Sequence, residues 1–142
     1  KEKLYDFVVE EVFASLQDLF TGISTTKTDF RGLLEGFTQA YVDFLEKNEH
    51  VPAIVLREFA GDGGRGQEIV TEQMVPVLDW VENVITEMGS GIIREGLPIR
   101  AAIMQIGSDA LVRAMAKSMR EKLWGAESKS VILSNILFFG EA

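Results

Sequence analysis

Cysteine is absent from this 142-residue sequence, and histidine occurs once. The chain therefore has no disulfide and no thiol nucleophile, and it lacks the repeated Glu-x-x-His pattern of a di-iron helical bundle. The single histidine, His50, has Lys47 three positions before it, and we expect it to be an exposed residue at a helix entrance. No serine has a histidine close to it in the sequence, so we expect no catalytic, metal or cofactor site.

Long apolar runs and an excess of basic residues are also missing. No stretch approaches the roughly 18 apolar residues of a membrane-spanning helix, and the first residues do not have the pattern of a signal peptide. The 14 basic residues are outnumbered by 22 acidic ones, which gives a net charge of −8. Binding to a phosphate backbone requires clustered Lys and Arg. We therefore expect a cytoplasmic protein whose residues in this stretch contact neither a membrane nor a nucleic acid.

Apolar residues are abundant, and they recur at helical spacing. They make up 46% of the chain, which is enough for one globular core at this length. Apolar positions repeat with the i, i+3, i+4, i+7 pattern, and no convincing period-two alternation occurs. The sequence predicts a single all-α domain over residues 1–142, a six-helix bundle with helices at about 4–20, 27–48, 52–60, 67–88, 98–123 and 128–139.

Glycine, proline and polar residues predict where these helices begin and end. Gly22 is expected to stop the first helix, and Thr26 to cap the second with Asp29 three residues later. Pro52 suits the first position of the third helix. Pro76 removes one hydrogen bond from the fourth helix and is expected to kink it.

The glycine-rich segment from Gly61 to Gly66 matches Gly-x-Gly-x-x-Gly, a dinucleotide-binding pattern. That pattern binds pyrophosphate only when a strand leads into it and a helix follows. The residues before Gly61 have helical spacing instead. We therefore interpret the segment as an interhelical loop, and a cofactor-dependent enzyme is the disfavoured alternative.

Aromatic and methionine side chains lie at helical spacing on segments expected to pack together. Such side chains usually form core, and a ligand cavity is the alternative. The Pro76 kink and the bulky, irregular side chains favour a cavity, because such a bundle is hard to pack without leaving space. The candidate ligand-binding residues are Phe37, Tyr41, Phe44, Met74, Trp80 and Met104.

The last two predicted helices are apolar beyond one face. One chain of this size has too few other helices to cover both of them, which favours a twofold interface formed by two copies of this pair. A monomer with a helix-covered core is the alternative. The candidate interface residues are Ala110, Ala114, Ile132, Ile136 and Phe139.

Several segments resemble TetR-family transcriptional regulators. Lys1, Glu2 and Leu4 resemble the second half of the Phe-x-Ser-Lys-Glu-x-Leu pattern that follows the helix-turn-helix of these proteins. Three further segments resemble features that the family keeps less strictly: the short helix at 52–59, the connection at 91–96 and the ending at 136–140. The similarity extends over the chain in element order, through motifs that are individually weak.

The resemblance implies a homodimeric, ligand-responsive regulator, usually a repressor, that dimerises through its last two helices. A small apolar or aromatic effector would lie among the second, fourth and fifth helices, and the first helix would transmit its effect. The chain begins at Lys1 within an amphipathic pattern, so we expect a helix-turn-helix upstream, through which alone the protein would contact DNA. A standalone helical homodimeric module without ligand or DNA-binding partner is the alternative.

Arginine residues offer a further possibility for ligand recognition. Arg57, Arg94, Arg100 or Arg113 could recognise a carboxylate on the effector. Arg113 is equally explained by an i, i+4 ion pair with Asp109. The sequence leaves this choice open.

Overall fold

A computed structural model describes residues 2–27, 29–126 and 129–141 of the chain. Within these ranges the protein forms seven α-helices and no β-strand, so the predicted all-α class is confirmed. The predicted number of helices was too low by one. The helices are α1 Glu2–Thr26, α2 Phe30–Lys47, α3 His50–Phe59, α4 Arg65–Met88, α5 Ile99–Met115, α6 Arg120–Trp124 and α7 Ser130–Phe139.

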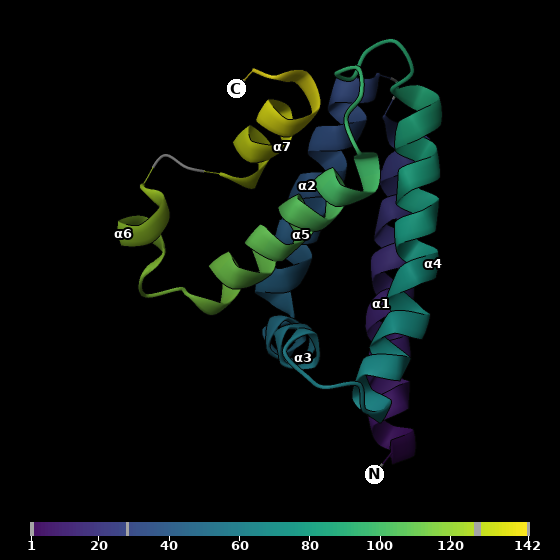
Figure 1. The fold of residues 1–142 in the computed structure, drawn as a ribbon, viewed down its shortest axis with the longest axis vertical. Coiled ribbons are helices and arrows are strands. Elements are labelled where there is room, and N and C mark those ends of the chain that lie inside the picture. Colours follow the sequence, from purple (N-terminus) through teal and green to yellow (C-terminus); the bar gives the residue numbers. More distant parts are fainter. Residues whose placement is uncertain (1, 28, 127–128, 142) are drawn as a thin grey trace.

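The two longest helices, α1 and α4, lie side by side and run in the same direction (Figure 1). Their first turns are joined by an ion pair of 2.6 Å between Arg65 of α4 and Asp6 of α1. α2 runs in the opposite direction to both, and α3 crosses below it. α5 packs against α2, α3 and α4, and α7 packs against α2 and α5. The short α6 projects to one side.

One apolar core joins all the helices except α6. Its most buried members include Leu33 of α2 and Phe138 of α7, both with no exposed surface. On α1 the buried stripe begins at Val9, whereas Leu4 is 68% exposed. The predicted apolar face of the first helix was therefore too long at its amino-terminal end, because this end extends past the neighbouring helices (Figure 1).

The boundary between α1 and α2 differs from the prediction. Gly22 does not stop α1, which continues to Thr26. The hydroxyl groups of Ser24 and Thr25 donate to backbone carbonyls three residues earlier, at 2.7 and 2.8 Å, and so hold the last turn. Thr26 is therefore helical, and Asp29 is the actual N-cap of α2, where its carboxylate accepts a hydrogen bond from the Gly32 N–H at 3.2 Å.

The segment predicted as one helix over 98–123 divides into α5 and α6. The Arg120 Nε donates to the backbone carbonyl of Arg113 at 3.0 Å, near the end of α5. The Trp124 Nε1 donates to Asp109 Oδ1 at 2.9 Å. These two hydrogen bonds hold α6 against α5. If α5 continued as one straight helix, the donor and acceptor of each bond would be too far apart to form it.

Pro52 and Pro76 lie within helices, and the glycine-rich segment connects two helices. α4 runs without interruption through Pro76, whose ring is exposed. α3 begins at His50, which is exposed as expected, so Pro52 takes its third position rather than its first. The segment from Gly61 to Gly66 lies between two helices, and α4 begins inside it at Arg65. It therefore lacks the preceding strand of a dinucleotide-binding loop.

Two features of the sequence analysis involve residues outside the described ranges. Lys1 belongs to the segment that resembles the TetR family, and residue 128 marked the expected start of the last helix. Among the helices that the structure does describe, none is both long and apolar enough to cross a membrane.

Candidate ligand-binding cavity

A cavity of about 130 Å3 lies inside the bundle. Its wall is built from five helices, α1 to α5, and Phe138 of α7 contributes to it as well. The helices meet here because each presents an apolar stripe to the same axis, and the bulky side chains on these stripes do not fill the space completely. The cavity is therefore formed by core residues, with partly exposed residues in its wall.

Most of the predicted ligand-binding residues are brought together at this cavity. Its lining includes Phe37, Tyr41 and Phe44 of α2, Met74 of α4 and Met104 of α5. Trp80 is not part of the lining. Its ring packs behind Phe37, with 5.9 Å between the ring centroids.

The cavity wall carries few polar groups. The Tyr41 hydroxyl donates to the Gly107 carbonyl of α5 at 3.3 Å. The Thr38 hydroxyl donates to the Leu34 carbonyl of its own helix at 2.9 Å, so it is already satisfied. Ser108 of α5 supplies a third hydroxyl. Burial raises the pKa of Tyr41 above its ordinary value, so its phenol stays neutral at physiological pH.

Among the residues that the structure describes, no charged side chain belongs to the lining. Arg100 of α5 forms ion pairs with Asp79 and Glu82 of α4 outside the cavity. Arg113 pairs with Asp109 at 2.6 Å, the i, i+4 pair that the sequence offered as its alternative role. A charged ligand buried in this cavity would find no opposite charge to compensate its lost hydration.

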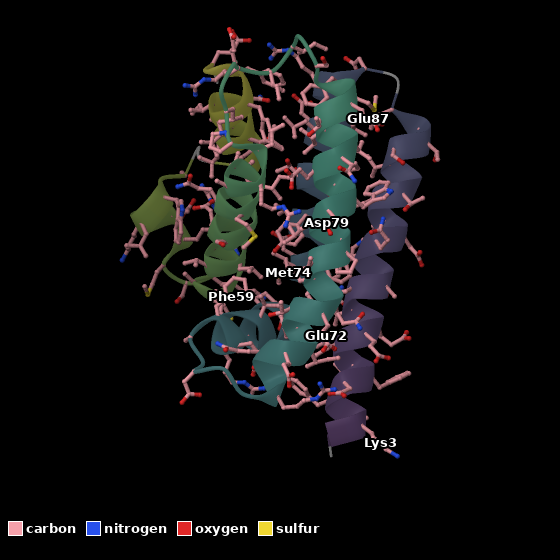
Figure 2. All side chains as sticks on the ribbon, turned by 45° about the vertical axis from the view of Figure 1, so that its right-hand side comes forward. Lys3, Phe59, Glu72, Met74, Asp79 and Glu87 are labelled. Atoms are coloured by element: carbon pink, nitrogen blue, oxygen red, sulfur yellow. The ribbon has the colours of Figure 1, made fainter. Side chains whose placement is uncertain are left out.

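Part of the cavity wall is exposed near the junction of α3 and α4. Phe59 of α3 belongs to the lining although 43% of its surface is exposed. Met74 of α4 is half-buried and also lines the cavity. Figure 2 shows both residues on the same side of the molecule, next to the place where α3, α4 and α5 meet. A ligand could enter here by displacing two side chains that have several rotamers.

The parts of the wall that come from α1, α3 and α7 were not among the predicted ligand-binding residues. Phe13 and Leu16 of α1 line the cavity, as do Val55 of α3 and Phe138 of α7. These are ordinary apolar positions, and nothing in their local pattern distinguishes a cavity wall from filled core. The signal that could have found Phe13 and Leu16 was their place on the buried stripe of the first helix.

The predicted interface residues point in different directions. Ile132 and Ile136 of α7 are exposed, at 36% and 44%. Ala110 is buried within the chain, and the Phe139 ring packs edge-on against Phe30 at 5.9 Å between centroids. Further exposed apolar side chains follow on α5 and α6. We call the exposed set the outer apolar side chains: Val112, Met115, Met119, Leu123, Ile132 and Ile136.

A second hollow, of about 250 Å3, lies between α2, α5 and the start of α7. Ala110 and Ala114 form part of its wall, so both face this groove rather than the outer apolar side chains. Arg113, Arg120 and Lys129 also line it. Arg113 is held by Asp109, and Arg120 lies 3.7 Å from Glu46. The groove thus has charged side chains in its wall, two of them in ion pairs, in contrast to the cavity.

Comparisons with family models, with curated proteins and with solved structures reveal no match to this chain. The resemblance to TetR-family regulators therefore rests on the sequence features described above.

Proposed function

We propose that this chain is the effector-binding and dimerisation domain of a ligand-responsive transcriptional repressor of the TetR type. The observation that carries this proposal is the apolar cavity inside the bundle, which has a wall built from many helices and a partly exposed lining residue, Phe59. Natural cores are packed with few voids larger than a water molecule. An apolar lining with a few polar groups is typical of a small-molecule site, and a volume of about 130 Å3 suits a small compound.

The position of the cavity suggests how an effector would act. Val12, Phe13, Leu16 and Phe20 of α1 contribute to its wall. A ligand that fills the cavity would favour conformations with α1 displaced, and α1 is the helix expected to follow a DNA-binding domain. The exposed Leu4 and Phe7 at its first turns offer an apolar surface for that domain. The effector would thus shift the spacing of two upstream domains by population shift.

The outer apolar side chains support the homodimer in this proposal. They are large hydrophobic groups that stay exposed on α5, on α7 and on α6 with the turn before it. A second copy would cover them with an identical surface across a twofold axis. Static light scattering should then give twice the 15.8 kDa of one chain. A monomer at micromolar concentration would exclude this part of the proposal.

The cavity can be tested by filling it from Gly107. A Cβ atom at this position would meet only Tyr41 atoms, at 3.9 Å, so a larger side chain has room to extend into the cavity. Gly107→Leu should abolish the thermal stabilisation that small apolar or aromatic compounds confer on the wild type. Gly107→Ala is the matched control, which should retain it. Compounds that stabilise Gly107→Leu as much as the wild type would show that the cavity is not their site.

A standalone helical module remains the alternative. It shares the dimer but requires neither a ligand nor an upstream domain. The residues encoded before Lys1 discriminate between the two, because a basic helix-turn-helix there identifies a regulator. In the full-length protein, a compound that binds the cavity should also release DNA in a gel-shift assay, and unchanged DNA binding would favour the module.

A further inference from the structure

The volume of the cavity limits the size of its ligand. The cavity measures about 130 Å3. A protein cavity of about 150 Å3 that is lined by leucine, isoleucine and phenylalanine stays dry and binds benzene. The cavity of this chain is slightly smaller and is lined by the same kinds of side chain. It therefore suits one six-membered ring, and a second fused ring would require the wall to move.

Aromatic rings form much of the cavity wall. Phe20 of α1 and Phe37 of α2 pack edge to face there, with 5.2 Å between their ring centroids. The face of an aromatic ring is electronegative and its edge is electropositive, so such a wall attracts a further aromatic ring more than a saturated ring of the same size. Six of the nine phenylalanines line the cavity: Phe13, Phe20, Phe37, Phe44, Phe59 and Phe138.

Two methionine side chains contribute to the wall from opposite helices. Met74 lies on α4 and Met104 on α5. A thioether sulfur makes favourable contacts with aromatic rings, often at the ring edge. Because methionine has three rotatable bonds, both side chains can adjust their positions around a bound ring. The methionines thus favour the same class of ligand as the phenylalanines.

The polar groups of the wall favour an uncharged ligand. The Tyr41 hydroxyl donates to the Gly107 carbonyl, and the Thr38 hydroxyl donates to the Leu34 carbonyl. None of the wall residues that the structure describes is charged. A carboxylate or ammonium group in the cavity would therefore lose its hydration without gaining an opposite charge.

We propose that the cavity binds a single uncharged aromatic ring, of the size of benzene or toluene, through edge-to-face contacts with the phenylalanine rings and contacts with the two methionine sulfur atoms. This inference rests on the proposed function, because it names the ligand class of the same cavity.

A comparison of benzene with cyclohexane tests the aromatic contacts. Both compounds have six carbons, and cyclohexane is the more apolar of the two, so burial of apolar surface alone would favour cyclohexane. Each edge-to-face contact should strengthen binding by roughly twofold to tenfold. Calorimetric titration of the wild type in a sealed cell should therefore show benzene binding at least about threefold more tightly. A smaller preference for benzene, or a preference for cyclohexane, would overturn the aromatic assignment.

Naphthalene and benzoate test the limits of size and charge. Naphthalene has more apolar surface than benzene and would bind more tightly in a site without a size limit. We expect the wild type to bind it more weakly than benzene, and Met104→Ala, which widens the cavity, to bind it about tenfold more tightly than the wild type. Met119→Ala is the matched control, because Met119 is 51% exposed and outside the wall. Naphthalene or benzoate binding the wild type as tightly as benzene would overturn the proposal.

Nuclear magnetic resonance of methyl-labelled methionines locates the ring without any substitution, so the proposal stays testable if Met104→Ala does not fold. The chain has five methionines. Met74 and Met104 line the cavity, whereas Met88, Met115 and Met119 are exposed and lie outside its wall. The ring current of bound benzene should shift the first two methyl resonances and leave the other three unchanged. Shifts confined to Met115 and Met119 would place the ring on the outer surface and overturn the proposal.

Failure of this inference and failure of the proposed function give different results. Cyclohexane or naphthalene that binds the wild type more tightly than benzene, and does not bind Gly107→Leu, would retain a ligand-binding cavity while excluding the single aromatic ring. A wild type that binds none of these compounds, and that no other small apolar compound stabilises, would remove both.

Discussion

The inner and outer sides of the last helices carry similar apolar side chains in opposite situations. Phe138 of α7 points inward, has no exposed surface and lines the cavity. Ile136, two residues earlier on the same helix, points outward and is 44% exposed. α7 as a whole is so apolar that its composition does not distinguish one side from the other. The difference arises from α2 and α5, which cover one side only.

The comparison shows that the chain buries only some of its large apolar side chains. The inward side chains are covered by the chain itself, although they enclose unfilled space. The outer apolar side chains stay exposed, and in the proposed homodimer a second copy would cover them. Substitutions on the two sides should therefore change different quantities, the free energy of unfolding on the inside and the oligomeric state on the outside.

The largest effect is expected from Phe138→Ala. The substitution removes a fully buried ring and enlarges an existing cavity, which should lower the free energy of unfolding by about 3 kcal/mol or more. Urea denaturation followed by circular dichroism measures this change. A loss below about 1 kcal/mol would show that the inner side of α7 is not part of the core.

Ile136→Asp should act on the outer side. A charge at this position would be buried twice in a twofold interface, so we expect the dimer dissociation constant to rise about a hundredfold or more. Sedimentation or light scattering measures the mass of each variant. Leu19→Asp is the matched control, because Leu19 is similarly exposed, at 42%, but lies on α1. Equal behaviour of the two variants would remove α7 from the interface.

Tyr41 should make the inner side sensitive to alkaline pH. Burial raises its pKa in the folded protein above the ordinary value of about 10. A raised pKa contributes stability that is fully present below the unfolded value and is lost as pH increases above it. The free energy of unfolding should therefore fall above pH 10, by up to about 1.4 kcal/mol per pH unit from this residue. Tyr41→Phe should reduce that slope, and an unchanged slope would contradict the burial of the hydroxyl.

The smallest effect is expected from Arg100→Ala. Its ion pairs with Asp79 and Glu82 link α5 to α4 near the cavity but remain accessible to solvent. We expect a loss below about 1 kcal/mol that disappears in high salt. A large, salt-independent loss in thermal unfolding would mean that charges rather than apolar contacts hold the cavity wall together.

The predictions from sequence succeeded where a local pattern carries the information. The helical spacing of α2 identified Phe37 and Phe44, which are both buried at the cavity. The break between α5 and α6 was missed because its cause is the hydrogen bonds of Arg120 and Trp124 with residues of the preceding helix. Such hydrogen bonds depend on how the chain folds back on itself, and the spacing of apolar residues does not predict them.

Ala110 illustrates the same limit at the proposed interface. Its small side chain allows close helix approach, and the sequence pattern alone could not say which helix approaches. In the structure Ala110 is buried inside the chain and lines the groove beside α2. Ile132 and Ile136 were predicted as interface residues together with Ala110, and both are exposed.

The sequence by itself determined that this protein is all-helical and which faces of α2 and α4 turn inward, because helix formation and amphipathic spacing are local properties. Only the tertiary structure decided that these faces enclose an apolar cavity, that Tyr41 donates to Gly107 in its wall, and that the two sides of α7 differ. These features depend on contacts between residues far apart in the chain, where small differences in side-chain volume decide whether space is filled or left open.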